Sequence, residues 1–295
     1  MIHCIYHDRD LDGITSAAIV QRLVPGVALH GMDYGDKVPW DAFGPDDTVW
    51  VVDFCPDTGP CLATMPNMRR LVATVARVIW CDHHATALNG AAAAGLNPPG
   101  MRGLDHSGCE LTWMTAFPDA PMPRAVHLLG RYDIHDRTDP DALPFQQGMQ
   151  ALGLTPESKE WQTLLAPPDD PTTDMLVRQL TLQGLPILKW QEQYWLRYFA
   201  DNAYPVEFEG QKGLALNVCP PNGSRCFEDT PSAKDRPLWV TFGRCADGTW
   251  KLSFHAPSDS DVDCAAIATR HGGGGHDKAA GAVLDSLPDW VLTRA

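Results

Sequence analysis

Three short apolar segments in the first third of the chain each end in acidic or imidazole side chains. These segments span residues 2–6, 48–52 and 78–81, and the polar residues that follow them begin at His7, Asp53 and Asp82. Buried polar groups are costly unless they are paired or coordinate a ligand. Because ligands gather at the carboxyl ends of parallel strands, we expect these side chains to lie close together at one edge of a sheet.

Strands and helices alternate through the first half of the chain. Residues 13–24 carry apolar side chains at near-helical spacing and end at Pro25-Gly26, which stops a helix. A strand is predicted over residues 27–34 and another helix over residues 67–76, and residues 109–153 are mostly helical. This alternation predicts an α/β fold with a mostly parallel sheet.

The second half of the chain has a different pattern. After a segment rich in Pro and Asp, a long helical pattern runs to about Ala203, with interruptions expected at Gly184 and Pro186. The remaining strands and one helix predict a second, smaller α/β domain. We expect a metal-binding domain at 1–153, a linker and connecting helix at 154–203, and a substrate-binding domain at 204–295.

The composition limits the class of protein. The 295 residues are 44% hydrophobic and 20% charged, with a formal charge of −14. Such a charge disfavours binding to long polyanions. Two other interpretations of the negative charge are that some of the acids are metal ligands, and that many cytosolic proteins are simply acidic. Nine scattered cysteines without a C-x-x-C pair fit reduced thiols, and no signal or membrane-spanning segment is evident. We therefore expect a cytoplasmic protein that does not bind membranes.

The first polar cluster runs from His7 to Gly13 and contains Asp10 and Asp12. Asp10 and Asp12 are two positions apart, so their side chains can point into two adjacent sites. Sites with several carboxylates and some imidazole suit Mn²⁺ or Mg²⁺. A carboxylate such as Asp53 can bridge two ions. A solvated acidic turn is the alternative interpretation of this cluster when it is taken alone.

A further acid, Asp133, ends a predicted helix, where its charge opposes the helix dipole. A metal ion would stabilise the carboxylate there. An exposed helix end with Arg131 as the partner explains the sequence equally well.

A glycine-rich segment, Gly272–Gly281, lies between a predicted helix and a strand. Its small residues leave backbone N–H groups able to surround an anion, and His276 and Lys278 would add charge. A flexible linker is the alternative. In the long helix, Trp190 and Tyr194 belong to an aromatic stripe that we interpret as a packing surface rather than a platform for bases.

His7–Gly13, Asp53, Asp82-His83-His84 and Asp133 resemble, in order, the four motifs of the DHH phosphoesterase superfamily. Gly272–Gly281 resembles the signature of the accompanying DHHA1 domain. The first motif is closest in style to the branch that degrades nano-RNA. The resemblance implies two domains with the active site in the cleft between them. It also implies two Mn²⁺ ions, with Mg²⁺ or Co²⁺ as alternatives, and hydrolysis of a phosphoester.

The resemblance also assigns roles to the polar residues of the first domain. The first ion would be held by His7, Asp10 and Asp53. The second would be held by Asp12, Asp53, His83 and Asp133. Asp82 would complete or support the metal site and take part in catalysis, and His84 would contact the scissile phosphate or protonate the leaving oxygen.

The substrate contacts implied by the resemblance lie mainly in the second domain. They are Ser107, His255, Arg270, His271, Gly273, Gly274, Gly275 and His276, together with His84. His255 stands where many relatives carry an arginine that binds a substrate phosphate. The chain also lacks the extra OB-like domain with which the RecJ branch holds long single-stranded DNA.

Short RNA or DNA oligonucleotides, including dinucleotides, are the favoured substrates, with nucleoside monophosphates as products. A small nucleotide, such as 3′-phosphoadenosine 5′-phosphate or a cyclic dinucleotide, and a longer single strand are the alternatives. A degenerate metal-binding module without activity would have lost ligands, and the sequence retains each of them. A monomer and a homodimer are both compatible with the sequence.

Overall fold

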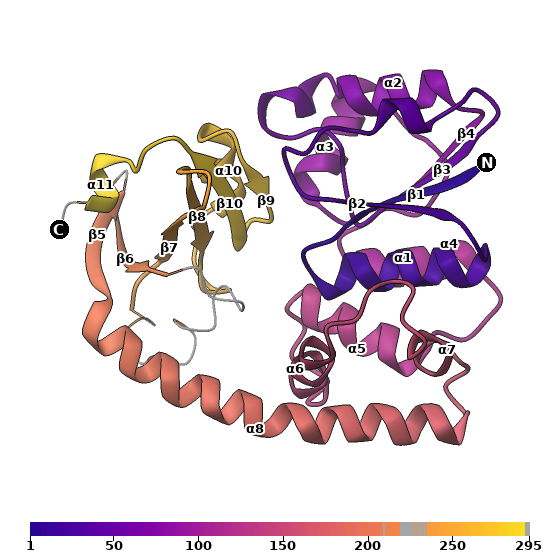
Figure 1. Cartoon of the computed structure of the whole chain (residues 1–295). Coiled ribbons are helices and arrows are strands. Elements are labelled where there is room, and N and C mark those ends of the chain that lie inside the picture. The colour runs from indigo at the N-terminus through magenta and orange to yellow at the C-terminus, as the bar shows by residue number, and fades with distance from the viewer. Residues whose placement is uncertain (209, 219–226, 228–229, 231–232, 234, 293–295) are drawn as a thin grey trace. The chain divides into compact units, whose positions relative to one another are not determined.

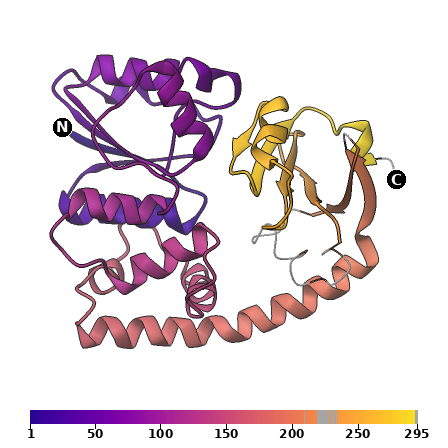
Figure 2. The same cartoon turned by 180° about the vertical axis from the view of Figure 1, so that it is seen from behind.

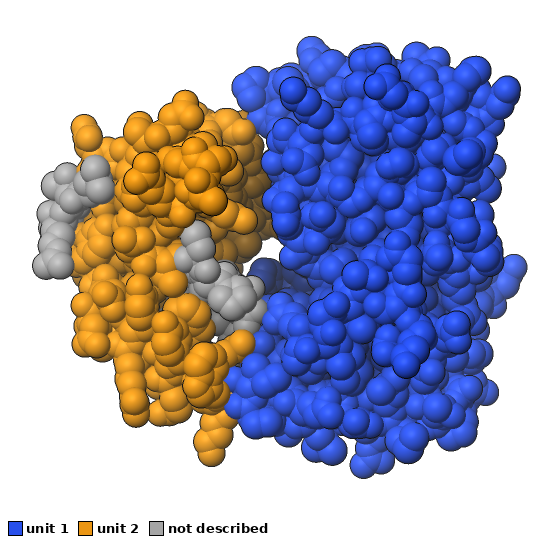
Figure 3. All heavy atoms as spheres, in the orientation of Figure 1, with its two compact units in different colours: residues 1–188 blue, residues 189–295 orange. Residues whose placement is uncertain are grey.

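The computed structural model describes the whole chain except residues 209, 219–226, 228–229, 231–232, 234 and 293–295. It divides into two compact units, residues 1–188 and 189–295, which Figure 3 draws in blue and orange. The division falls inside the long helix α8 (Pro171–Asn202). The domain limits predicted at residues 153 and 203 therefore remain our proposal for where the functional domains end.

A four-stranded parallel sheet forms the centre of the first unit (Figure 1). Its strands are β1 (Ile2–His7), β2 (Ala28–Met32), β3 (Thr48–Val52) and β4 (Arg77–Cys81). They lie in the order β2-β1-β3-β4, and every pairing is parallel. The predicted parallel sheet is confirmed, and the carboxyl ends of all four strands meet at one edge.

Helices cover both faces of this sheet, as Figures 1 and 2 show. One face is covered by α1 (Leu11–Leu23) and α4 (Gly108–Ala116), and the other by α2 (Pro66–Thr74) and α3 (Ala85–Ala94). Two short 3-10 helices, η1 (Trp40–Ala42) and η2 (Gly59–Ala63), lie in the connections. Burial on both faces explains why the strands are almost wholly apolar.

A helical layer packs beneath α1. It contains α5 (Arg124–Asp133), α6 (Ala142–Leu152), α7 (Trp161–Leu164) and the first part of α8. Its core includes Phe145 and Leu128, both fully buried. This layer places the last residue of α5, Asp133, beside the start of α1.

The helix α8 is continuous from Pro171 to Asn202, so the interruption predicted at Gly184 and Pro186 is wrong. Gly184 instead allows close contact with α6, because a Cβ atom there would lie 1.7 Å from the carbonyl oxygen of Pro144. Although α8 is long, none of the helices in the described part of the chain combines the length and apolarity needed to cross a membrane.

The second unit contains a six-stranded mixed sheet in the order β5-β6-β7-β8-β10-β9. The strands are β5 (Tyr204–Phe208), β6 (Gln211–Asn217), β7 (Leu238–Arg244), β8 (Trp250–His255), β9 (Gly274–Gly275) and β10 (Ala279–Leu284). The helix α10 (Cys264–Arg270) packs on this sheet, and α11 (Asp289–Leu292) follows β10. The predicted smaller α/β unit is confirmed.

The aromatic stripe of α8 does not act as one packing surface. Trp195 is buried in the core of the second unit, and the partly buried Tyr198 packs against that core. Trp190 is 65% exposed and stacks on Tyr194, with ring centroids 5.4 Å apart. The packing interpretation therefore holds for part of the stripe only.

The close crossing of α6 and α8 yields a test of the fold. Replacing Gly184 with alanine forces a methyl group against the Pro144 carbonyl. We expect the free energy of unfolding to fall by about 2 kcal/mol, because overpacking outweighs the better helix propensity of alanine. Urea unfolding followed by circular dichroism measures this change.

Gly103→Ala is the matched control, because a Cβ atom at Gly103 would meet no atom within 4 Å. This variant should unfold within about 0.5 kcal/mol of the unmodified protein. Equal stability of the two variants would show that α6 and α8 do not cross as closely as described.

Candidate metal centre

The eight metal and catalytic residues predicted in the first unit lie together at the carboxyl edge of the parallel sheet. Three groups of side chains each bring one potential ligand atom per residue within 4.8 Å of the others. The groups are His7 with Asp10 and Asp53, Asp12 with His83 and Asp133, and Asp53 with Asp82 and His84. The first group has the composition predicted for the first ion. The second contains three of the four residues predicted for the second ion, and Asp53 lies between these sets.

Asp10 holds the junction between β1 and α1. One carboxylate oxygen caps the helix by accepting a hydrogen bond from the Gly13 N–H at 2.9 Å, and the other lies 2.9 Å from His7 Nδ1. Gly13 is required there, because a Cβ atom would lie 2.0 Å from the His7 carbonyl oxygen. The helix begins at Leu11, earlier than predicted, so Asp12 belongs to its first turn.

Asp12 is held by the N-terminus of α4. Its Oδ1 accepts hydrogen bonds from the Ser107 hydroxyl at 2.9 Å and the Cys109 N–H at 2.8 Å, and its Oδ2 accepts one from the Gly108 N–H at 2.7 Å. These three hydrogen bonds fix the carboxylate of Asp12 at the N-terminus of α4. Ser107 is fully buried and also caps α4. Ser107 thus supports Asp12, and its predicted contact with the substrate stays a prediction.

Asp53 sits in a strained conformation directly after β3. Its φ angle is +49°, which non-glycine residues rarely adopt, and its N–H donates to the Cys81 carbonyl at 2.8 Å. The carboxylate reaches the centre only because residue 108 is glycine, since a Cβ atom there would lie 2.6 Å from Asp53 Oδ1. Strain of this kind is typical of functional sites.

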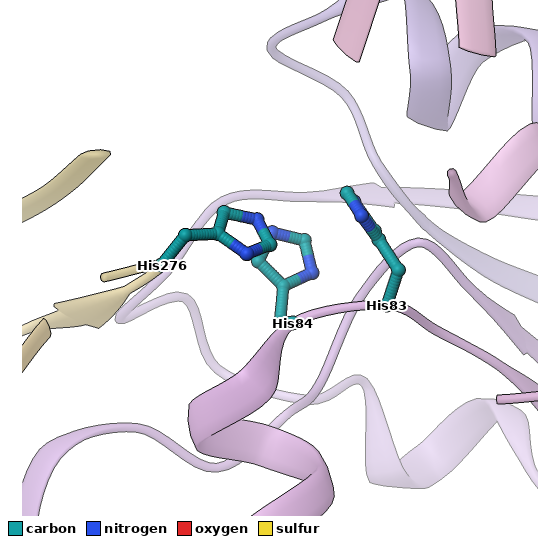
Figure 4. A group of neighbouring side chains, drawn as sticks. All are labelled: His83, His84 and His276. Atoms are coloured by element: carbon teal, nitrogen blue, oxygen red, sulfur yellow. The ribbon is translucent and has the colours of Figure 1, made fainter. Parts of the chain in front are cut away.

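The Asp82-His83-His84 segment follows β4, and its side chains make two different sets of contacts. Figure 4 shows the two imidazole rings that the segment contributes. Asp82 Oδ1 accepts hydrogen bonds from the His83 N–H and lies 2.8 Å from His84 Nδ1. His83 Nε2 instead lies 3.3 Å from Asp53 Oδ1 and 3.2 Å from Asp133 Oδ2. His83 therefore faces the carboxylates, whereas Asp82 and His84 form a pair beside them.

Asp133, at the end of α5, contacts the centre through His83. Arg131, the alternative partner suggested by the sequence, pairs with the buried Glu110 and lies 3.4 Å from Asp136. Arg131 thus joins the ends of α5 and α4. The structure favours the interpretation in which Asp133 belongs to the centre.

The electrostatics of the centre suit a divalent cation. Burial, with the nearby charges of Asp12 and Asp10, raises the pKa of Asp53 well above its usual range. Within the part of the chain that the structure describes, the buried atoms Asp53 Oδ1 and Asp82 Oδ2 accept no hydrogen bond. Carboxylate oxygens and imidazole nitrogens are suitable ligands for ions such as Mn²⁺. The residues of the centre therefore fit divalent metal ions.

The electrostatic surroundings of His7 also favour a positive charge in the centre. Burial would lower the pKa of His7, but hydrogen bonds to Asp10 and Asp33 raise it to about 10. Without a cation the imidazole therefore holds a proton between two carboxylates, Asp10 Oδ2 at 2.9 Å and Asp33 Oδ1 at 3.6 Å. A metal ion bound by His7 would displace that proton.

Asp33 and Tyr34 belong to the centre although the sequence analysis did not find them. Asp33 contacts His7 and accepts a hydrogen bond from Arg9 Nε at 2.9 Å. The Tyr34 hydroxyl lies 3.2 Å from His84 Nε2. Both residues follow β2 as Asp53 follows β3, but the predicted strand at residues 27–34 included them. Had the predicted strand ended at Met32, Asp33 would have been an acidic residue directly after a fourth strand.

Close packing within the second unit explains two glycines of the segment Gly272–Gly281. A Cβ atom at Gly273 would lie 1.9 Å from the Gly281 carbonyl oxygen, and one at Gly275 would lie 2.6 Å from Ala280 Cα. These glycines, with Gly274 between them, bring β9 against β10. This packing requirement does not test whether Gly273, Gly274 and Gly275 bind substrate, which stays a prediction.

The other predicted substrate residues occupy different positions in the second unit. His276 follows β9 and its N–H donates to the Ala279 carbonyl at 2.7 Å. His255 is buried at the end of β8, and Arg270 ends α10. The adjoining His271 ring stacks on Phe254, with centroids 6.1 Å apart.

Lys278 does not act as a freely available cation. Its ammonium group donates to the Ser260 carbonyl at 2.6 Å and lies 3.6 Å from an Asp277 carboxylate oxygen. The charge predicted for anion binding instead holds the loop before α10.

Residues 228–290 match the family model of the DHHA1 domain. No curated protein matches the sequence. The fold is similar to an uncharacterized protein from Helicobacter pylori G27, with 14% identity, a TM-score of 0.40, and coverage of 98% of this chain and 94% of that one. It is also similar to the pGpG-specific phosphodiesterase PggH from Vibrio cholerae, with 10% identity, a TM-score of 0.44, and coverage of 96% and 92%. At these scores neither likeness bears on the substrate.

The family model that matches residues 228–290 shows that the second α/β unit contains a DHHA1 domain. This match confirms the resemblance of Gly272–Gly281 to the DHHA1 signature.

The raised pKa of Asp53 predicts how metal and stability are linked. A carboxyl group whose pKa is higher in the folded than in the unfolded protein lowers the free energy of unfolding as pH rises through that window. At pH 7 the metal-free protein bears this cost. Asp53→Asn should therefore raise the melting temperature of metal-free protein by a few degrees and reduce the stabilisation that Mn²⁺ provides, as measured by calorimetry.

Asp46→Asn is the control, because it makes the same charge change at an exposed position. It should leave both melting temperatures and the Mn²⁺ response unchanged. If Asp53→Asn destabilised the metal-free protein and kept the full Mn²⁺ response, Asp53 would not be a metal ligand.

The proton held by His7 predicts a pH-dependent metal affinity. Since the pKa of His7 is about 10 in the metal-free centre, metal binding at pH 7 to 8 should release roughly one proton or more. The affinity for Mn²⁺ should rise with pH over this interval. Titration calorimetry in buffers of different ionisation enthalpy measures the number of protons released, and a value of zero would contradict the assignment of His7.

Proposed function

We propose that the protein is a Mn²⁺-dependent phosphodiesterase that hydrolyses short oligonucleotides, including dinucleotides, to nucleoside monophosphates. The observation that carries this proposal is the position of Asp53, which belongs to one ligand group and lies beside another. His7 and Asp10 stand in one group with Asp53, and His83 of the other group lies 3.3 Å from Asp53 Oδ1. A carboxylate shared in this way is suited to hold two ions close together.

When bound, two such ions would activate a water molecule and neutralise charge on the phosphate. The protein supplies the fixed positions of the ligands. Three hydrogen bonds from the start of α4 hold Asp12, and its backbone conformation directs Asp53 toward the centre. Ligands that are fixed before the reaction avoid reorganisation at the moment of bond breaking.

Asp82 and His84 act beside the metal ligands. The fully buried Asp82 holds His84 through Nδ1, so the imidazole has a fixed orientation. Its Nε2 edge is directed away from Asp82, toward the outer part of the centre, where the Tyr34 hydroxyl lies. In our proposal His84 and the neighbouring Tyr34 together serve the scissile phosphate and the leaving oxygen.

Net charge supports a short substrate. At −14, the chain carries an excess of acidic groups that repels a long phosphate backbone. A dinucleotide has few phosphates, and metal ions can neutralise the one that reacts. The substrate-binding roles proposed for Arg270, His271 and His276 concern the remote part of such a molecule.

Specificity constants for four substrates test this function. The Mn²⁺-loaded protein is incubated with an RNA dinucleotide, an RNA of about 24 nucleotides, a cyclic dinucleotide and 3′-phosphoadenosine 5′-phosphate. We expect kcat/KM for the dinucleotide to exceed that for the longer RNA by about tenfold or more, because longer chains add repulsion. Asp53→Asn is the inactive control for contaminating nucleases.

Preference for the long RNA would overturn the proposed substrate class, and preference for the cyclic or bisphosphate nucleotide would replace it. If none of the four were hydrolysed by the unmodified protein, the phosphodiesterase proposal itself would be wrong.

A further inference from the structure

Tyr34 lies in the metal centre at a position fixed by aromatic contacts. Its ring stacks on Phe54, with centroids 5.5 Å apart and planes 28° apart, and lies 5.1 Å from the His7 ring. Its hydroxyl lies 3.2 Å from His84 Nε2. The ring contacts set the place of the hydroxyl independently of that hydrogen bond.

Asp82, His84 and Tyr34 form a chain of side chains. Asp82 Oδ1 already accepts the His83 N–H, and His84 Nδ1 lies 2.8 Å away from the same oxygen. A carboxylate only accepts hydrogen bonds, so Nδ1 carries a proton and donates it. Tyr34 then contacts the opposite nitrogen of the ring.

Exposure increases along this chain. The Asp82 side chain is fully buried, the His84 side chain is 18% exposed, and Tyr34 is 42% exposed. Tyr34 is therefore the outermost residue of this chain. Because the Tyr34 hydroxyl occupies the Nε2 edge of His84, a substrate approaching that edge meets Tyr34 first.

We propose that Tyr34 is a catalytic residue whose hydroxyl turns its proton from His84 Nε2 to the leaving oxygen of the substrate, to which it then donates a hydrogen bond. This inference rests on the proposed phosphodiesterase function. His84, held by Asp82, is then a positioning residue that keeps the hydroxyl in place. The hydrogen bond stabilises the negative charge that grows on the leaving oxygen as the P–O bond breaks.

Such a contact matters most when the leaving group is poor. A ribose oxygen gains a large negative charge as it leaves, whereas a p-nitrophenolate disperses its charge over the aromatic ring. A residue that only shapes the site would affect both substrates alike. Leaving-group dependence therefore separates a hydrogen bond to the leaving oxygen from a structural role.

The test compares Tyr34→Phe with the unmodified protein on an RNA dinucleotide and on the p-nitrophenyl ester of a nucleoside 5′-phosphate. The substitution keeps the ring and removes the hydroxyl. We expect kcat on the dinucleotide to fall by about tenfold with KM within about twofold, and kcat on the ester to fall by less than about twofold. Tyr194→Phe, which removes a hydroxyl from the exposed part of α8, should change neither.

Equal losses on both substrates, or no loss on either, would overturn the role of Tyr34 while leaving the phosphodiesterase function intact. A loss confined to KM would also overturn it. If the unmodified protein hydrolysed neither substrate, the proposed function would fail, and the inference about Tyr34 would fail with it. Metal content and melting temperature are measured on each variant to confirm that the centre is intact.

Discussion

The repulsion among the carboxylates at the carboxyl edge of the parallel sheet is the constraint on which the rest of the first unit depends. Burial and neighbouring negative charges raise the pKa of Asp53, and partial burial with Asp12 and Asp10 does the same for Asp133. The surrounding structure nevertheless holds these groups together. The start of α4 anchors Asp12, and the absence of a side chain at Gly108 admits Asp53. An arrangement that is costly without cations is suited to bind them.

The sequence predicted the parts of this centre that depend on strand ends. The alternation of strands and helices predicted a parallel sheet. The polar residues that begin at His7, Asp53 and Asp82 were then expected to meet, because the carboxyl ends of parallel strands lie at one edge. Asp33 and Tyr34 were not predicted, because alternation alone did not show that β2 ends at Met32. The contact of Ser107 with Asp12 joins residues that are 95 positions apart, and local sequence patterns do not carry such information.

Glycine patterns were harder to interpret than acidic ones. Gly184 was predicted to interrupt α8, but it allows two helices to cross closely, a requirement that only tertiary structure reveals. Gly273 and Gly275 permit close strand packing, which the sequence could not distinguish from anion binding. Lys278 is engaged by Ser260, and Trp190 lies outside the buried part of its aromatic stripe. In each case the decisive contact is distant in sequence or depends on the exact face of a helix.

The number and spacing of bound ions test the central claim most directly. Electron paramagnetic resonance of the protein titrated with Mn²⁺ reports both quantities in one experiment. The shared position of Asp53 predicts two Mn²⁺ ions per chain with a spin-coupled signal at saturation. Two uncoupled ions, or a single ion whose signal is unchanged in Asp53→Asn, would contradict a two-ion centre that shares this carboxylate.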